Sequence, residues 1–361
     1  MLNMTIGLNR VADSVLEQMR LSPPSIIDGE FLRLFAKCLV DIKIILGAHD
    51  GHSFIIPGTG TMGMEMCVSN FVSPGSSAAI ISTGFWGERW AAICRRLGIN
   101  VHQLTCPGGN APDMVQVKSL LSGSSCRAVL STHVDSSSGV LTDLQSLGAV
   151  ARESGAITIV DGICAAGIET IEQSLWNIDV YLTSSHKGLG VPAGLNLISV
   201  SNNAMSSLTN RSWECPSFSL DLTSWIPVMR AAEEGTLDYF QSPAATLILG
   251  LCEGLRLVRT EGVEMRADRH HSLRQMLHAG LLTSGIKLLI TDTTAFANGV
   301  TVCLYPDSRG PDFLEDVKKC GVLLAAGMPG GVTSNTFRIG HMGNVTPADI
   351  KMTLRAIQQA M

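Results

Sequence analysis

Two side chains in this sequence suit the chemistry of a bound cofactor, and each follows a short apolar run. Lys187 lies in TSSHKGLGVPAG, residues 183–194, where small polar residues give way to a Gly/Pro-rich turn. Asp161 closes the run AITIVD, residues 156–161. A lysine at the end of a parallel strand lies where such sheets bind ligands, and its small neighbours leave room for a flat ring. The alternative for Lys187 is an ordinary surface lysine, and the alternative for Asp161 is a helix N-cap.

Together the two residues predict pyridoxal 5′-phosphate (PLP) as a cofactor. A carboxylate at the end of a buried strand costs free energy unless it is paired. In PLP enzymes a lysine carries the cofactor and an aspartate pairs with the pyridine nitrogen, which makes the ring an electron sink. Lys187 and Asp161 are therefore the predicted catalytic residues.

A glycine-rich turn follows an earlier apolar run. In PGTGTMGMEM, residues 57–66, a strand is expected to end and a helix to begin. Backbone N–H groups at a helix N-terminus bind phosphate, although a simple glycine turn has the same letters. The segment matches neither GxxxxGK[ST] nor GxGxxG, which disfavours nucleotide binding.

Three further side chains are candidates for the same site. Trp86, in STGFWGERW, could stack on a flat ring, and Ser136, in HVDSSSG, could hydrogen-bond the cofactor. Arg338, in TFRIGHMG, could hold a carboxylate through two parallel hydrogen bonds. The alternatives are core packing for Trp86, a turn serine for Ser136 and a surface salt bridge for Arg338.

Composition and missing motifs exclude several other classes. The 361 residues carry a formal charge of −5, so nucleic acid and anionic membranes are not expected partners. No apolar run reaches the roughly 18 residues that span a bilayer. The ten cysteines show no CxxC spacing and no HExxH occurs, so we expect no metal site. GxSxG is also absent, which argues against an α/β-hydrolase. No secretory signal is recognised, and the cytoplasm is the expected compartment, with peroxisome and mitochondrion left open.

The elements that must position these residues alternate between strand and helix. Such alternation predicts an α/β fold with a mostly parallel sheet covered on both faces. The expected strands are 53–57, 78–82, 101–104, 128–132, 157–161, 180–184 and 195–200, and the expected helices between them are 61–72, 87–97, 112–121 and 144–153.

The two ends of the chain differ from this middle part. The first forty-odd residues are predicted to be helical, with Val11, Val15, Leu16 and Met19 on one face. Helices over 244–260 and 265–282, strands at 300–304, 322–324 and 336–339, and a helix from Pro347 predict a smaller α+β domain. The predicted division is a helical arm at 1–50, a large domain at 51–242 and a small domain at 243–361.

Read together, seven segments resemble the class V PLP-dependent aminotransferases, in particular the alanine–glyoxylate and serine–pyruvate types. The resemblance runs from about residue 53 to the end of the chain. Its carriers are PGTGTMGMEM, STGFWGERW, STHVDSSSGVL, IVDGICAAG, TSSHKGLGVPAGL, YFQSP and FRIGHMGNVT. It implies a fold-type I homodimer with a seven-stranded sheet in the large domain, in which alanine or serine donates an amino group to glyoxylate or pyruvate.

The resemblance also implies roles for individual residues. Lys187 would form the Schiff base, Asp161 would face the pyridine nitrogen, Trp86 would stack on the ring and Ser136 would lie near its polar edge. The remaining roles are the following: Thr59, Gly60, Thr61 and His186 at the phosphate, Tyr239 and Ser242 at the phosphate of the partner subunit's cofactor, and Arg338 at the substrate α-carboxylate.

The sequence departs from the family pattern at two places, and some activities stay open. Many relatives have glutamine at His186, and IGLNR replaces a Gly-Pro-rich N-terminal opening that helps wall the substrate pocket. A phosphonate aminotransferase, a kynureninase-like hydrolase and a catalytically inactive PLP-binding protein remain alternatives. Cysteine desulfuration is disfavoured because Cys303 and Cys320 are expected in a strand and a helix rather than in a loop.

Overall fold

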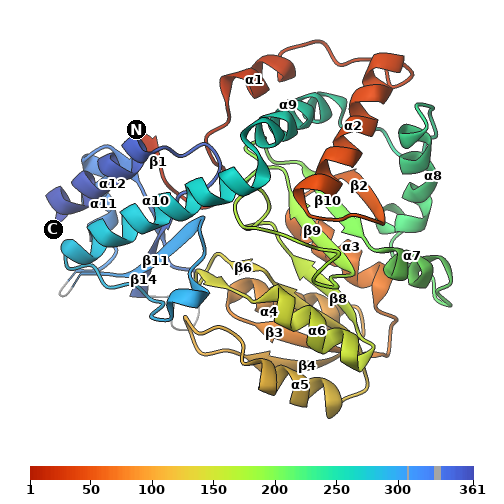
Figure 1. Ribbon diagram of the computed structural model, residues 1–361, viewed down its shortest axis with the longest axis horizontal. Helices are drawn as coiled ribbons and strands as arrows, with labels where there is room; N and C mark the ends of the chain where they lie inside the picture. The colour runs from red at the N-terminus through yellow and green to blue at the C-terminus, as the bar shows by residue number, and fades with distance from the viewer. Residues whose placement is uncertain (307–308, 329–334) are drawn as a thin grey trace.

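The computed structural model describes residues 1–306, 309–328 and 335–361, and it has a large and a small domain (Figure 1). The large domain is built on one seven-stranded sheet. Its strands, in spatial order, are β2 (His52–Pro57), β10 (Leu195–Val200), β9 (Val180–Ser184), β8 (Ile157–Asp161), β5 (Cys126–Thr132), β3 (Ser77–Ser82) and β4 (Asn100–Thr105). The strand pairings run parallel except those that β10 makes with β2 and β9. The predicted mostly parallel sheet is therefore confirmed.

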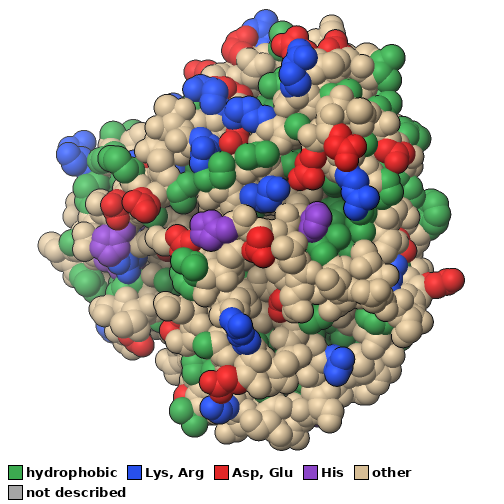
Figure 2. All heavy atoms as spheres, turned by 45° about the vertical axis from the view of Figure 1, so that its right-hand side comes forward, with side chains coloured by type: hydrophobic (Ala, Val, Ile, Leu, Met, Phe, Trp, Pro, Cys, Tyr) green, Lys and Arg blue, Asp and Glu red, His purple; other side chains and the backbone are tan. Residues whose placement is uncertain are grey.

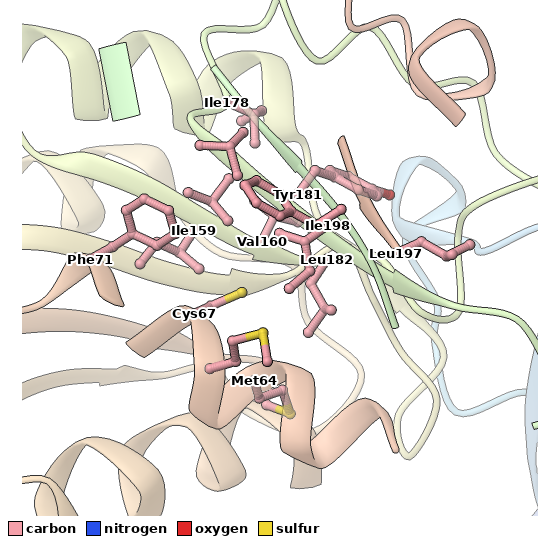
Figure 3. Close-up of a cluster of buried hydrophobic side chains, with 14 of the residues drawn as sticks. Met64, Cys67, Phe71, Ile159, Val160, Ile178, Tyr181, Leu182, Leu197 and Ile198 are labelled. Carbon is pink, nitrogen blue, oxygen red and sulfur yellow. The ribbon is translucent and has the colours of Figure 1, made fainter. Parts of the chain in front are cut away.

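Helices follow the strands as the sequence predicts. They are α3 (Gly60–Phe71), α4 (Phe85–Arg96), α5 (Met114–Ser122) and α6 (Leu144–Ser154). Figure 3 shows how α3 packs on the sheet: Met64, Cys67 and Phe71 face a group of side chains from β8, β9 and β10. These side chains are buried on both sides of the contact, which is why the strands are apolar on successive residues.

The segment after the sheet is helical and leads into the second domain. α7 (Asn202–Thr209) and α8 (Leu222–Glu233) belong to the large domain, and α9 (Ala245–Glu261) lies against α2 (Gly29–Ile45) (Figure 1). α10 (Val263–Thr283) begins after Gly262, whose φ of 88° suits glycine. Its last three turns bury Leu273, Leu277 and Leu281 in the core of the small domain. The two domains are thus joined by helix, as expected.

The small domain is an α+β unit. β11 (Val300–Leu304), β14 (Thr336–Gly340) and β13 (Ala325–Ala326) form an antiparallel sheet. α12 (Pro347–Ala360) packs beside α10, and α11 (Asp312–Lys319) packs against α12. α12 starts with a capping box between Thr346 and Asp349, which fixes its first turn.

The N-terminal prediction was wrong for the first residues. Instead of a helix, the chain opens with β1 (Leu2–Asn3), which pairs in parallel with β12 (Val322–Leu323) of the small domain. Met4 is fully buried there, and its carbonyl accepts a hydrogen bond from the N–H of Gly340 at 2.7 Å. Helix begins only at α1 (Asp13–Met19), where Val15 is buried but Leu16 is 44% exposed. This pairing joins opposite ends of the chain, so no local pattern indicated it.

The molecular surface carries charged side chains of both signs (Figure 2). On the face shown in Figure 2, acidic and basic side chains are interspersed rather than gathered into a basic patch. In the described part of the chain, no helix is long and apolar enough to cross a membrane.

Candidate active site

A cavity of about 580 Å³ lies where the parallel strands end. β2, β3, β5, β8 and β9 point their carboxyl ends to one edge of the sheet, which is where open α/β sheets bind ligands. The volume is in the range of small-molecule sites. The cavity lining includes seven of the predicted residues: Thr59, Gly60, Thr61, Trp86, Asp161, His186 and Lys187.

Lys187 is buried beside the cavity rather than on the surface. It follows β9 by three residues and is 6% exposed. Its Nζ donates to the Sγ of Cys164 at 2.8 Å and lies 5.9 Å from the centre of the Trp86 ring. No carboxylate pairs with this amine within 4 Å in the residues that the structure describes. A buried amine without an ion-pair partner is costly, so this placement points to a functional use.

Asp161 ends β8, the strand next to β9, and is 3% exposed. One carboxylate oxygen accepts a hydrogen bond from the N–H of Ile163 at 2.9 Å, and within the described ranges the other has none. Burial raises the pKa of Asp161 to about 6, while the Ile163 N–H and the charge of Lys187 oppose that rise. The free oxygen can therefore accept a proton or pair with a cation in the cavity.

The predicted phosphate loop begins α3. Thr59 is the N-cap, and its hydroxyl accepts from the N–H of Met62 at 3.3 Å. The N–H groups of Gly60 and Thr61 lie in the first turn, where the helix offers no carbonyl partner. Both residues line the cavity, so this helix start presents free donors to an anion.

Trp86 is held in place by the loop after β5. Its indole Nε1 donates to the hydroxyl of Ser136 at 2.8 Å. Its backbone N–H, like that of Gly87, donates to the buried carboxylate of Asp135, at 3.0 and 3.3 Å. Asp135 also accepts from the N–H and hydroxyl of Ser137. Ser136 therefore contacts Trp86 directly, and Asp135 fixes the start of α4.

His186 lies between Ser184 and Lys187 at the end of β9. Its Nδ1 is 3.0 Å from the hydroxyl of Ser184. Burial, helped by the charge of Lys187, lowers the pKa of His186 to about 4, so the imidazole is neutral at pH 7 in this structure. A bound phosphate would favour the protonated form and raise that pKa.

Arg338 lies on β14 at the side of the site that faces the small domain. Its Nη1 donates to the carbonyl oxygen of Ser136 at 3.1 Å, and its Nε donates to that of Ala326 at 2.9 Å. The first bond joins the small domain to the loop that holds Trp86, and the second lies within the small domain. Among the residues that the structure describes, no carboxylate pairs with Arg338. Neither Arg338 nor Ser136 is among the described residues that line the cavity.

Tyr239 and Ser242 are not brought to this cavity. The Tyr239 hydroxyl is 3.1 Å from the Ser242 hydroxyl, and Tyr239 is 59% exposed. Tyr239 lines a different, much smaller hollow that also includes Phe31 and Trp225. Within one subunit these two residues therefore stand apart from the other predicted site residues.

Sequence reasoning missed three parts of the site. Cys164, in the segment IVDGICAAG, contacts Lys187, and Asp135 could have been found from its Asp–Ser–Ser turn. The N-terminal segment contributes Asn3, Thr5, Ile6, Gly7 and Leu8 to the cavity lining. Asn3 shapes that segment: its side chain accepts from the N–H and hydroxyl of Thr5 and donates to the carbonyl of Leu8. IGLNR thus helps to wall the cavity.

The donor set of the cavity fits PLP. A primary amine, a buried carboxylate with an unbonded oxygen, an indole face and a free helix N-terminus surround one space. They match an aldehyde carbon, a pyridine nitrogen, a flat ring and a phosphate, respectively. The fold and this donor set define a PLP-dependent enzyme of fold type I.

The family follows from comparison with known proteins. The model of the family described as aminotransferase class V matches residues 27–348. The chain belongs to the class V aminotransferases, and these enzymes depend on PLP.

Individual relatives are similar over most of their length. Alanine–glyoxylate aminotransferase 1 of Saccharomyces cerevisiae is 29% identical, over 90% of this chain and 88% of its own. The small subunit of a soluble hydrogenase from Synechococcus is 27% identical, over 98% of this chain and 91% of its own. The crystal structure of alanine–glyoxylate aminotransferase from Nostoc superposes with a TM-score of 0.94 at 24% identity, over 99% of this chain and 94% of that one. This last likeness shows the shared fold.

Proposed function

We propose that this enzyme transfers an amino group from alanine or serine to glyoxylate or pyruvate. The observation that carries the proposal is the placement of Lys187 and Asp161 at the ends of neighbouring strands in one cavity, which the start of α3 also lines. The yeast relative's name supports alanine and glyoxylate as substrates, because the similarity covers nearly all of both chains.

In this proposal Lys187 attaches the cofactor and then acts as the general acid–base. When bound, PLP withdraws electrons from the bond between the substrate Cα and its hydrogen. The Nζ of Lys187 would take the proton from the substrate Cα, which requires an uncharged amine near the substrate. The position of Lys187 supports this role, because it lines the cavity and its Nζ lies 5.9 Å from the centre of the Trp86 ring.

Asp161 supplies the negative partner of the ring nitrogen. Its raised pKa would fall again beside a pyridinium, since an opposite charge favours the carboxylate. Trp86 would stack on the ring, and its orientation is fixed by Ser136. The first-turn amides of α3, with Thr59 and His186, would hold the phosphate.

Arg338 binds the substrate carboxylate. Its two carbonyl partners orient the guanidinium, which still has N–H groups to donate. A planar fork of donors matches a carboxylate, so an α-amino acid is held in one orientation. We further propose a homodimer in which Tyr239 and Ser242 reach the phosphate bound in the partner subunit, and a cytoplasmic location.

The test is a single half-reaction with a panel of amino acids. PLP-loaded enzyme is mixed with alanine, serine, aspartate or a phosphonate-bearing amine in the absence of any acceptor, and the 2-oxo acid released is counted. We expect about one equivalent of pyruvate or hydroxypyruvate per subunit with alanine or serine, and regeneration of the enzyme by glyoxylate. Release only from aspartate or from the phosphonate would contradict the substrate assignment.

A further inference from the structure

A buried arginine on α10 lies behind the cavity. Arg266 is 3% exposed and belongs to the first turn of the helix. Its Nε donates to the carbonyl oxygen of Gly167 at 2.9 Å, and its Nη2 donates to that of Gly188 at 2.8 Å. Gly188 follows Lys187 directly, and Gly167 lies in the series of turns that follows Asp161. One guanidinium therefore joins the two loops that carry the proposed catalytic pair.

These two loops touch through their backbones. A Cβ atom at Gly188 would lie 2.2 Å from the carbonyl oxygen of Ala166. A Cβ atom at Gly167, whose φ is 72°, would lie 3.3 Å from Gly188 backbone atoms. The side chains of Ile168 and Leu189 flank this contact, at 2.6 Å and 3.2 Å from those two Cβ positions. The bonds from Arg266 add a further link between the loops, because they fix both carbonyls to one planar group.

A second arginine extends the link to a third loop. Glu261, at the end of α9, contacts Arg266 Nη1 at 2.5 Å and Arg269 Nε at 2.6 Å. Arg269 donates to the carbonyl oxygens of Gly343 and Val345 at 3.0 Å each. These residues follow β14, the strand that carries the proposed carboxylate-binding arginine. Glu261 thus joins the two guanidinium groups that hold all three loops.

The position of Arg266 is unfavourable by local rules. A cation near the first turn of a helix meets the positive end of the helix dipole. Its burial also costs free energy unless its donors are satisfied. Glu261 and the carbonyl oxygens of Gly167 and Gly188 provide that compensation. A residue that breaks a local preference and is fully compensated points to a role beyond stabilising its helix.

We propose that Arg266, held by Glu261, is the positioning residue that fixes Lys187 and Asp161 relative to each other. The proposal rests on the proposed function, in which both residues act on one cofactor. Arg266 is not among the described residues that line the cavity, so it acts through the loops and touches neither cofactor nor substrate.

The test compares three variants of the full-length, PLP-loaded protein. Arg266→Gln removes both bonds that bridge the loops. Arg266→Lys keeps the positive charge but not the planar arrangement of donors. Arg256→Gln is the matched control. Arg256 lies on α9, is 52% exposed and pairs with Glu253 on the surface. Hydrogen exchange over residues 161–169 and 185–191, the dissociation constant for PLP, and the pH at which the visible absorbance changes are measured for each.

We expect Arg266→Gln to speed exchange in both loops and to raise the PLP dissociation constant by about tenfold, which is the effect of one lost charge-assisted bond. The visible absorbance of this variant should change at a different pH from that of the wild type, because the distance between the charge of Asp161 and Lys187 would differ. Arg266→Lys should be intermediate, since an ammonium group reaches one carbonyl well. Arg256→Gln should match wild type in all three measurements.

The proposal is wrong if Arg266→Gln lowers only the unfolding temperature and leaves loop exchange, PLP affinity and the absorbance profile unchanged. If Arg266→Gln does not fold, Glu261→Gln gives the same test, because it keeps both arginines but removes the carboxylate that pairs with them. Borohydride mapping of the wild type separates the two claims. If the wild type is labelled on Lys187 but the Arg266 and Glu261 variants behave like the wild type in all three measurements, only the positioning role is rejected. If the wild type is labelled on another lysine, the proposed function is rejected.

Discussion

Asp161 illustrates how burial prepares a single side chain for a cationic partner. The carboxyl group is buried at the end of β8, and one of its oxygens is not hydrogen-bonded within the described residues. Burial raises its pKa from 3.8 to about 6. The folded chain therefore binds this proton more tightly than the unfolded chain, and the stability of the apoprotein should fall as the pH rises from about 4 to about 6.

Asp161→Asn should consequently stabilise the apoprotein while damaging the enzyme. Above pH 7 the variant removes a buried charge that costs roughly 3 kcal/mol on the basis of the raised pKa, and its amide oxygen still accepts the Ile163 N–H bond. Below pH 4 the stability difference should vanish. Urea unfolding of apoprotein at pH 3.5 and pH 8 measures it. Turnover should drop by orders of magnitude, because an amide is a poor partner for a pyridinium. Equal stability at both pH values would show that Asp161 already has a partner without PLP.

Arg338 differs from Asp161 because two carbonyl oxygens already accept bonds from its guanidinium. A lysine could not replace both of those bonds, because an ammonium group lacks the planar fork of a guanidinium. Arg338→Lys should raise KM for alanine or serine at least tenfold, since a lost desolvated charge pair costs about 2 kcal/mol or more. It should leave the PLP spectrum intact. Steady-state kinetics alongside absorbance scans check both points.

A control substitution separates substrate binding from domain contact. Arg309→Lys also alters a small-domain arginine, one that bonds to Asp316 and to the carbonyl of Ala360. It should leave KM unchanged. If Arg338→Lys bleached the cofactor, or left alanine and serine kinetics unchanged, the carboxylate role would be wrong.

At the scale of elements, alternation of apolar runs and helices was sufficient to predict the large domain. The strands over 157–161, 180–184 and 195–200 have the predicted bounds, since polar or glycine-rich turns limit them sharply. The helix α4 starts two residues earlier than predicted. Its N-cap, Gly84, has no capping side chain, and the carboxylate of Asp135 from another segment binds its first N–H groups instead. β1 was missed because its partner strand lies at the other end of the sequence.

The same distinction holds for the site. Residues at the carboxyl ends of strands could be predicted, because parallel strands bring their ends to one edge. The roles of Cys164 and Arg266 could not, because each depends on a contact between segments that no period or turn motif relates. The contributions of Asn3 and Thr5 to the cavity likewise depend on the pairing of β1 with β12.

The N-terminal segment should therefore matter for substrate binding. Removal of residues 1–8 deletes β1 and the cavity wall formed by Asn3, Thr5 and Ile6, but leaves α1 and the PLP-binding strands. We expect a several-fold higher KM for the amino donor and a lower unfolding temperature of the small domain, because buried Met4 is also lost. Asn3→Ala separates the effects, since it loosens the turn without removing Met4. An unchanged KM in both variants would show that the segment is only structural.

At the scale of the whole molecule, one subunit presents Tyr239 and Ser242 outside its own cavity. Tyr239 is exposed, and the apolar side chains of Phe218 and Leu237 are exposed in the same part of the sequence. Such exposed apolar residues are typical of an interface. The proposed homodimer with shared sites would account for both observations.

Mixed dimers test this arrangement. Inactive Lys187→Ala subunits, refolded with inactive Tyr239→Phe/Ser242→Ala subunits in equal amounts, should recover roughly a quarter of the wild-type activity, because half of the dimers then hold one intact site. Lys187→Ala mixed with Asp161→Ala is the control and should recover nothing, since both residues come from one subunit. Recovery in the control, or a fully active monomer, would contradict the shared site.

The central claim is that Lys187 carries the cofactor, and chemical labelling tests it most directly. PLP-loaded protein is reduced with sodium borohydride, digested and mapped by mass spectrometry. The structure predicts one pyridoxyl group per subunit, on the peptide that contains Lys187, because this buried amine shares the cavity with Asp161 and the start of α3. Lys187→Ala should bind PLP without becoming labelled. A label on any other lysine, or no label on protein incubated with PLP, would contradict the account.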